Sequence, residues 1–114
     1  MAHILVVEDE AIIAMMVGEW LTELDHEAVG PAPSVSAALA LLGSTDVQAA
    51  ILDLSLAGEQ SYAVADALQA KAIPFAFATG HGAGGIDARY ADVPVLTKPF
   101  NFGHLQNTLK KLLG

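Results

Sequence analysis

The sequence predicts an α/β protein in which a doubly wound, five-stranded parallel sheet is covered by helices on both faces. Five short apolar runs without polar–apolar alternation recur along the chain, as expected for strands that are buried on both sides. Segments with the 3.6-residue periodicity of amphipathic helices separate these runs, and such strand–helix alternation is typical of a parallel sheet with right-handed crossovers. The length of 114 residues predicts a single domain, residues 1–114.

The first two strand–helix units lie in the N-terminal part of the chain. Residues 3–7 are a continuous apolar run and predict a buried strand, and residues 10–24 predict a helix. The apolar stripe expected to face inward on this helix consists of Ile12, Ile13, Met16, Val17, Trp20, Leu21 and Leu24. Residues 27–31 predict a weaker strand, after which Ser34 is expected to cap a helix that Gly43 ends.

Three more units follow. The later strands are expected at residues 48–53, 74–79 and 94–97. The helices after them are expected at residues 60–71, 86–92 and 101–112. The helix at 86–92 is predicted to be short because a glycine-rich stretch precedes it, whereas Asn101 is a favourable cap for the last helix.

Composition excludes several function classes. The formal net charge is −8, which argues against direct binding to nucleic acid or to an anionic membrane surface. There is no cysteine, so disulfides and thiol chemistry are not expected. No signal peptide and no apolar run long enough to cross a bilayer are visible, and we therefore expect a cytoplasmic protein.

Polar residues gather at the ends of the predicted strands. Glu8 and Asp9 follow the first strand, Asp53 ends the third, Thr79 ends the fourth and Lys98 follows the fifth. The carboxyl ends of parallel strands meet at one edge of the sheet, where ligands of such folds bind. Three carboxylates crowded there disfavour one another's ionisation, and a divalent cation such as Mg²⁺ (or Mn²⁺) relieves this repulsion.

This set of residues is suited to phosphoryl transfer. The Asp53 carboxylate can act as a nucleophile and form an acyl phosphate. The cation and Lys98 would neutralise charge on the transferred oxygens, and Thr79 would add a hydroxyl donor. Each residue alone has an ordinary interpretation, such as an acidic helix N-terminus or a turn residue. Their occurrence together, each at a strand end, favours the catalytic interpretation.

With these residues in place, the chain resembles a CheY-like response-regulator receiver domain over essentially its whole length. The resemblance implies the flavodoxin/CheY-like strand order 2-1-3-4-5. It also implies that Glu8, Asp9, Asp53 and the backbone carbonyl of Ser55 hold the metal. Asp53 would accept a phosphoryl group from the phosphohistidine of a histidine kinase, or exchange it with a phosphotransfer protein. The protein would not be an enzyme beyond promoting its own aspartyl phosphorylation and dephosphorylation. The run Lys98-Pro99-Phe100 is characteristic of the family, which usually has a cis peptide bond before this proline.

Two departures from the family pattern concern signalling. Val95 stands in the last strand where receivers commonly carry a switch tyrosine or phenylalanine. The run Phe77-Ala78-Thr79-Gly80 resembles the stand-alone "FAT-GUY" receivers, although His81-Gly82 replace the expected hydrophobic residue and tyrosine. We hypothesise that phosphorylation orders residues 80–92 and that His81 tunes the lifetime of the phosphorylated state.

The outward face of the first helix is a candidate docking surface. With the predicted stripe inward, the residues expected in solvent are Ala11, Ala14, Met15, Gly18 and Thr22. No charge lies among them, which is unusual for an exposed helix face. In receivers, this face and the loop after Lys98 bind the helical bundle of a kinase, so Ala14, Met15 and Gly18 are the expected contacts.

Several alternatives stay open at this point. The chain is either a single-domain regulator or relay, or the receiver part of a hybrid histidine kinase. A receiver-fold scaffold that binds a partner without phosphorylation, and a homodimer through the last helices, are further options. A flavodoxin-like cofactor site is disfavoured, because Glu8, Asp9 and Glu10 occupy the position of the phosphate-binding loop and would repel a phosphate.

Overall fold

The computed structural model describes residues 1–56, 58–80 and 85–114. Its main sheet consists of five parallel strands in the order β2-β1-β3-β6-β7, which confirms the predicted order of the five principal strands. These strands are β1 (His3–Val7), β2 (Glu27–Ala32), β3 (Ala49–Asp53), β6 (Phe75–Thr79) and β7 (Val95–Thr97). Each predicted strand is present, with ends that differ from the prediction by one residue at most.

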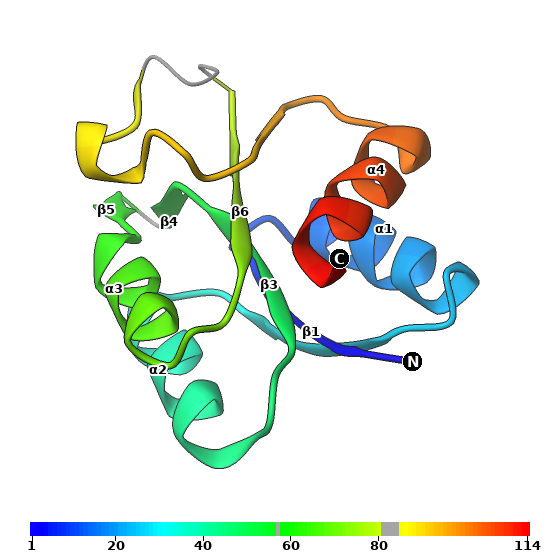
Figure 1. Cartoon of the computed structure of the whole chain (residues 1–114), viewed down its shortest axis with the longest axis horizontal. Coiled ribbons are helices and arrows are strands. Elements are labelled where there is room, and N and C mark those ends of the chain that lie inside the picture. The colour runs from blue at the N-terminus through cyan, green and yellow to red at the C-terminus, as the bar shows by residue number, and fades with distance from the viewer. Residues whose placement is uncertain (57, 81–84) are drawn as a thin grey trace.

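Helices cover both faces of the sheet. The four α-helices of the described residues are α1 (Ala11–Glu23), α2 (Val35–Ser44), α3 (Tyr62–Ala70) and α4 (Phe102–Leu113). Figure 1 shows α1 and α4 together on one face and α2 and α3 on the other. Two buried clusters correspond to these layers, and β1 contributes alternate residues to them: Leu5 and Val7 pack toward α2 and α3, whereas Ile4 and Val6 pack toward α1 and α4.

The predicted caps are present, and one predicted helix is shorter than expected. The Ser34 hydroxyl accepts a hydrogen bond from Ala37 N, and α2 continues one residue beyond Gly43 to Ser44. Asn101 caps α4, and its side chain and that of His104 form a reciprocal capping box. The helix predicted at 86–92 is a single 3₁₀ turn, η2 (Ala88–Tyr90).

A small hairpin between β3 and α3 was not predicted. It consists of β4 (Ser55–Leu56) and β5 (Glu59–Gln60), which pair antiparallel. Because Glu59 and Gln60 belong to β5, α3 begins at Tyr62 rather than at residue 60. Two-residue strands carry too little periodicity to be recognised in a sequence.

Strand register brings the polar strand ends into one row. Val7 pairs with Leu52, Asp53 with Ala78, and Thr79 with Thr97. The next residues after β1 and β7 are Glu8 and Lys98, so these side chains project from the same edge of the sheet as Asp53 and Thr79. The Lys98–Pro99 peptide bond is cis, as the family resemblance predicts.

Candidate active site

Asp53 is the last residue of β3 and is almost fully buried, with 6% of its surface exposed. One carboxylate oxygen, Oδ2, lies 3.1 Å from Lys98 Nζ. The other, Oδ1, accepts a long hydrogen bond of 3.4 Å from the backbone amide of Ser55. Both oxygens are therefore oriented, Oδ2 by a cationic side chain and Oδ1 by the backbone of Ser55 at the start of β4.

Glu8 is equally buried, with 5% of its surface exposed. Its Oε1 atom lies 3.0 Å from Lys98 Nζ, and Oε2 accepts a hydrogen bond of 3.1 Å from Glu10 N. Burial and the neighbouring Asp53 carboxylate raise the pKa of Glu8, and the bonds from Glu10 N and Lys98 only partly offset this rise. Burial therefore disfavours the ionised form of Glu8.

Lys98 connects the two buried acids. Its amine contacts Glu8 and Asp53 at once, and 18% of its side-chain surface is exposed. Burial alone would lower the pKa of Lys98, but the hydrogen bonds to both carboxylates outweigh it, so the pKa is raised. Lys98 therefore remains charged and offsets part of the negative charge of the site.

Thr79 and Asp9 complete the predicted set. Thr79 ends β6 and is buried, and its backbone carbonyl accepts a hydrogen bond of 2.8 Å from Lys98 N. Asp9 is exposed next to Glu8. Asp9, Asp53, Ser55, Thr79 and Lys98 line one cavity of about 570 Å³, together with Glu10, Leu54, Gly58, Gln60, Gly80 and Gly85. The structure thus brings Asp9, Asp53, Thr79 and Lys98 to one cavity, and the Lys98 side chain contacts Glu8.

The acidic side chains fit a divalent cation. Carboxylate oxygens of Glu8, Asp9 and Asp53 all lie within 4.8 Å of one another. Hard oxygen donors in this number are the ligands that Mg²⁺ and Mn²⁺ prefer in proteins. Ser55, whose backbone carbonyl the family resemblance implies as a further ligand, lines the same cavity.

Ser61 is a buried polar residue near the site that the sequence analysis did not identify. None of its surface is exposed, and its hydroxyl donates to the backbone carbonyl of Asp53 at 2.6 Å. The sequence predicts a helix at residues 60–71, and a serine at the start of a helix is ordinary, so no sequence signal distinguishes Ser61.

The predicted orientation of α1 is wrong in part. Ala14 is buried, with 5% of its surface exposed, whereas Ile12 and Met15 are 77% and 62% exposed. Ala14, Val17 and Leu21 form the inward stripe, which has the i, i+3, i+7 spacing of a helix face. Gly18 is half-buried. A small residue at position 14 lets the helix lie close to the sheet, and the larger Ile12 is turned outward. The exposed face therefore also carries Glu19 and Glu23, and the expectation of an uncharged face is wrong.

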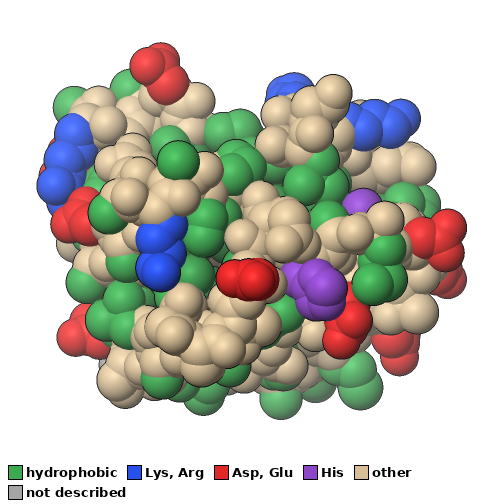
Figure 2. All heavy atoms as spheres, turned by 60° about the horizontal axis from the view of Figure 1, so that its bottom comes forward, with side chains coloured by type: hydrophobic (Ala, Val, Ile, Leu, Met, Phe, Trp, Pro, Cys, Tyr) green, Lys and Arg blue, Asp and Glu red, His purple; other side chains and the backbone are tan. Residues whose placement is uncertain are grey.

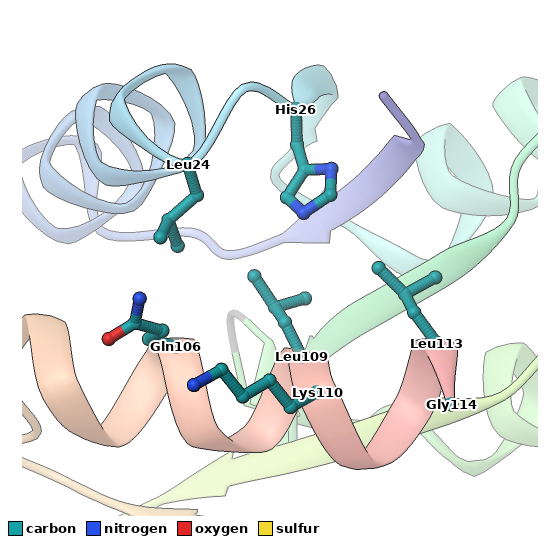
Figure 3. A pocket seen from close by; sticks show the side chains of 7 residues that line it. All are labelled: Leu24, His26, Gln106, Leu109, Lys110, Leu113 and Gly114. Carbon is teal, nitrogen blue, oxygen red and sulfur yellow. The ribbon is translucent and has the colours of Figure 1, made fainter.

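Two other regions lack the features of this site. A cavity of about 360 Å³ lies between the end of α1 and α4, lined by Leu24, His26, Gln106, Leu109, Lys110, Leu113 and Gly114 (Figure 3). Its lining includes no carboxylate side chain.

Figure 2 turns the bottom of Figure 1 forward. On that face, acidic and basic side chains lie among apolar and uncharged surface. His81 and most of the glycine-rich stretch lie outside the described residues, so the hypotheses about them are not tested.

Sequence and structure comparisons identify the class of protein. Residues 4–110 match the response regulator receiver domain family, and the chain belongs to this family. No curated protein sequence gives a significant match. No helix among the residues described here has the length and apolar character needed to span a membrane.

Solved structures give more particular similarities. SdrG from Sphingomonas melonis Fr1 is 45% identical over 100% of this chain and 98% of its own, with a TM-score of 0.89. The BeF₃-activated conformation of SdrG from Pseudomonas melonis Fr1 is 44% identical over 98% of this chain and 96% of its own, with a TM-score of 0.85. The response regulator PhyR from Brucella abortus is 28% identical over 98% of this chain but only 47% of its own, also with a TM-score of 0.85.

Proposed function

We propose that this receiver domain accepts a phosphoryl group on Asp53 from a phosphohistidine, in a reaction that requires Mg²⁺ or Mn²⁺. The observation that carries the proposal is the position of Lys98 Nζ, 3.0 Å from Glu8 and 3.1 Å from Asp53. A structural ion pair would need only one acid, whereas a phosphoryl-transfer site needs an acceptor carboxylate, metal-binding carboxylates and a separate cation. Glu8, Asp9, Asp53 and the Ser55 carbonyl would hold the metal.

The chain's own residues account for the transfer step. An oxygen of Asp53 attacks phosphorus, the phosphorus–nitrogen bond of the phosphohistidine breaks, and its electron pair remains on the imidazole nitrogen. Lys98 and the Thr79 hydroxyl would stabilise negative charge on the phosphoryl oxygens. A bound Mg²⁺ supplies further positive charge that lets the anionic phosphoryl group approach three carboxylates. In this proposal, the domain promotes only the phosphorylation and dephosphorylation of its own Asp53.

The partner would be a histidine kinase or a phosphotransfer protein that binds beside this cavity. We place its contact on the exposed N-terminal half of α1, around Met15 and Ile12, and on the loop after Lys98. Met15 and Ile12 are largely exposed apolar side chains in the first turns of α1, directly after the acidic residues of the site. Ala14, which the sequence predicts on this surface, is buried and does not belong to it.

Intact-mass measurement tests the acceptor. The wild-type chain is incubated with acetyl phosphate and Mg²⁺, in parallel with Asp53→Asn and with Asp46→Asn, an exposed aspartate in the loop before β3 that serves as the matched control. We expect one added phosphoryl group in the wild type and in Asp46→Asn, none in Asp53→Asn, and none after chelation of the metal. Labelling of Asp53→Asn at the wild-type rate would place the acceptor elsewhere.

A scaffold that works without phosphorylation is the second candidate function. It predicts no adduct with acetyl phosphate or with a phosphorylated phosphotransfer protein, at any Mg²⁺ concentration. The combination of a buried, oriented Asp53 with a charged Lys98 favours the phosphorylated receiver, because burying these charges costs free energy that binding alone does not require.

A further inference from the structure

The hydroxyl of Ser61 makes an unusual set of contacts for a residue at its position. Ser61 is the residue before α3, where a serine side chain normally accepts a hydrogen bond from the helix backbone. Here the side chain makes no capping bond. The hydroxyl instead points back along the chain, donating to the carbonyl of Asp53 at 2.6 Å and lying 3.2 Å from the carbonyl of Leu54. The backbone amide of Ser61 donates to the same Leu54 carbonyl at 2.9 Å.

These contacts hold the peptide unit that orients the acceptor. The carbonyl of Leu54 and the amide of Ser55 belong to one planar peptide unit. The Ser61 amide donates to the carbonyl end of this unit at 2.9 Å, and the Ser61 hydroxyl lies 3.2 Å from the same oxygen. The amide end of the unit donates to Asp53 Oδ1. Rotation of this unit would move the Ser55 amide away from the Asp53 carboxylate. The Ser61 contacts therefore help to fix the position of the amide that donates to Asp53 Oδ1.

The same contacts close the base of the hairpin that carries the predicted carbonyl ligand. Ser55 pairs with Gln60, the residue directly before Ser61. The hydroxyl bond from Ser61 to the Asp53 carbonyl therefore joins the two ends of the segment that contains β4 and β5. Because Asp53 and Ser55 are only two residues apart, the Ser61 hydrogen bonds position both the Asp53 side chain and the Ser55 carbonyl.

We propose that Ser61 is a positioning residue for metal binding and phosphoryl transfer, acting through the 54–55 peptide unit on Asp53 and on the Ser55 carbonyl. This inference rests on the proposed function. Removal of a group that hydrogen-bonds to a metal ligand typically lowers metal affinity or activity about 10- to 100-fold. Because Ser61 has no exposed surface, removal of its hydroxyl takes a donor from the Asp53 carbonyl in a desolvated part of the protein.

The test compares Ser61→Ala with Thr108→Ala. Thr108 is the matched control, because it is also a largely buried hydroxyl that donates to a backbone carbonyl, that of His104 at 2.9 Å, but within α4. Mn²⁺ affinity is measured by electron paramagnetic resonance, labelling by acetyl phosphate at saturating Mg²⁺ is measured by intact mass, and melting temperature is measured without metal. We expect Ser61→Ala to weaken Mn²⁺ binding and slow labelling, each by about tenfold, while Thr108→Ala leaves both within about twofold of the wild type.

A conservative variant separates positioning from stability. Ser61→Thr retains the hydroxyl, so we expect its Mn²⁺ affinity to return to within about twofold of the wild type even where the added methyl group lowers the melting temperature. Hydrogen exchange of the Ser55 amide in the metal-free protein should be faster in Ser61→Ala and unchanged in Thr108→Ala. Should Ser61→Ala not fold, Ser61→Cys is judged by the same criteria, because a thiol is only a weak donor.

The outcomes are distinguishable. If the wild type binds Mn²⁺ and is labelled but folded Ser61→Ala does both equally well, the positioning role is wrong and the proposed function stands. If the wild type neither binds Mn²⁺ nor becomes labelled, the proposed function fails and the positioning role fails with it.

Discussion

Glu8 is the residue at which the energetics of the site are most visible. It is buried beside another carboxylate, and burial together with Asp53 raises its pKa above the ordinary value of 4.5. For an acid whose pKa is raised by folding, the contribution to stability is present below the unfolded pKa and is lost as the pH rises through the folded pKa. At neutral pH, ionised Glu8 therefore lowers the stability of the metal-free protein, and a bound cation would offset this loss.

Replacing Glu8 by its neutral isostere tests this balance. In the presence of a chelator, we expect Glu8→Gln to melt at the wild-type temperature or higher, because one desolvated charge is removed while Lys98 keeps its contact with Asp53. Mg²⁺ at ten times its dissociation constant should stabilise the wild type by about 1.4 kcal/mol, and the variant by much less at the same concentration. Thermal unfolding followed by circular dichroism measures both quantities.

Glu23→Gln is the control for this substitution, because Glu23 is exposed at the far end of α1. It should keep the full response to Mg²⁺. A drop of several degrees in the melting temperature of Glu8→Gln without metal would mean that the Glu8–Lys98 pair stabilises the fold more than burial costs.

At the scale of elements, α1 presents two different surfaces along its exposed side. Ile12 and Met15 make the half next to the active site apolar, whereas Glu19 and Glu23 make the other half acidic. Exposed apolar side chains of this size, rimmed by charge, are typical of protein-binding surfaces. The position next to Asp9 and Glu10 suits a partner that must bring a phosphohistidine to Asp53.

The substitution Met15→Arg tests this surface. We expect transfer from a phosphorylated phosphotransfer protein that labels the wild type to slow by about tenfold, equivalent to ~1.4 kcal/mol of binding, while labelling by acetyl phosphate stays normal. Leu39→Arg is the matched control, because Leu39 is an exposed apolar residue on α2, on the opposite face of the sheet. Equal slowing with both phosphodonors would show that Met15 affects the site itself rather than docking.

The η2 turn (Ala88–Tyr90), which precedes β7, contacts α3 through aromatic and charged side chains. The rings of Tyr62 and Tyr90 stack at 5.5 Å, and the Arg89 guanidinium lies 4.8 Å from the Tyr90 ring centre. The Tyr90 hydroxyl donates to Asp66, which also pairs with Arg89 at 3.4 Å. Tyr90 is buried and packs edge-to-face on Phe77, two residues before Thr79, so this cluster lies next to the strand that carries the site hydroxyl.

This cluster predicts an alkaline loss of stability. Burial and the bond to Asp66 raise the pKa of Tyr90 to about 12. The unfolded chain loses this proton near pH 10, so the stabilisation is complete below pH 10 and is lost as the pH rises toward 12. We expect Tyr90→Phe to lower the free energy of unfolding by about 1 kcal/mol at pH 7 and to show a shallower decline between pH 10 and 11.

Urea unfolding at a series of pH values measures this difference. Asp46→Asn, an exposed acid elsewhere in the chain, should retain the wild-type slope. Parallel declines of Tyr90→Phe and the wild type above pH 10 would assign the alkaline loss to other groups.

At the scale of the whole molecule, two hydrophobic layers share one sheet. Leu68 of α3 lies in one layer and Leu105 of α4 in the other, and neither has any exposed surface. Because β1 and β3 contribute residues to both layers, loss of packing on one face removes the support of the other. The two layers should therefore unfold together.

Leu68→Ala and Leu105→Ala test this coupling. Each should cost about 2–5 kcal/mol, because each leaves a cavity in a closely packed layer. Trp20, the single tryptophan, packs edge-to-face against Phe100 and Phe102 and so reports on the α1–α4 layer. In both variants, Trp20 fluorescence and far-ultraviolet circular dichroism should give the same urea midpoint. A lower midpoint by circular dichroism than by fluorescence in Leu68→Ala would show that the layers unfold separately.

The fold and much of the site could be predicted from local sequence features. Buried parallel strands are continuous apolar runs, and strand–helix alternation restricts their connection to a parallel sheet. Once the strands are parallel and in register, residues at their carboxyl ends must converge. This is why the sequence places Asp53, Thr79 and Lys98 at one edge of the sheet, and why Lys98 Nζ lies 3.1 Å from the Asp53 carboxylate.

The errors arose where apolar character alone was ambiguous. On α1, Ile12 was expected inside and Ala14 outside, and the reverse is found. Several apolar residues compete for one stripe on this helix, and the choice among them depends on how closely the helix approaches the sheet. The hairpin of Ser55–Leu56 and Glu59–Gln60 was missed because each strand has only two residues.

The sequence by itself determined the alternation of elements, the caps at Ser34 and Asn101, and the polar residues at the strand ends, because these depend on periodicity and on neighbours along the chain. Tertiary structure alone decided the pairing of Lys98 with both Glu8 and Asp53, and the turning of the Ser61 hydroxyl away from its helix toward the Asp53 carbonyl. The physical reason is burial. A buried carbonyl or carboxylate needs a hydrogen-bond donor, and the packing of the fold decides which donor lies close enough. In this site, residues distant in sequence supply several of these donors.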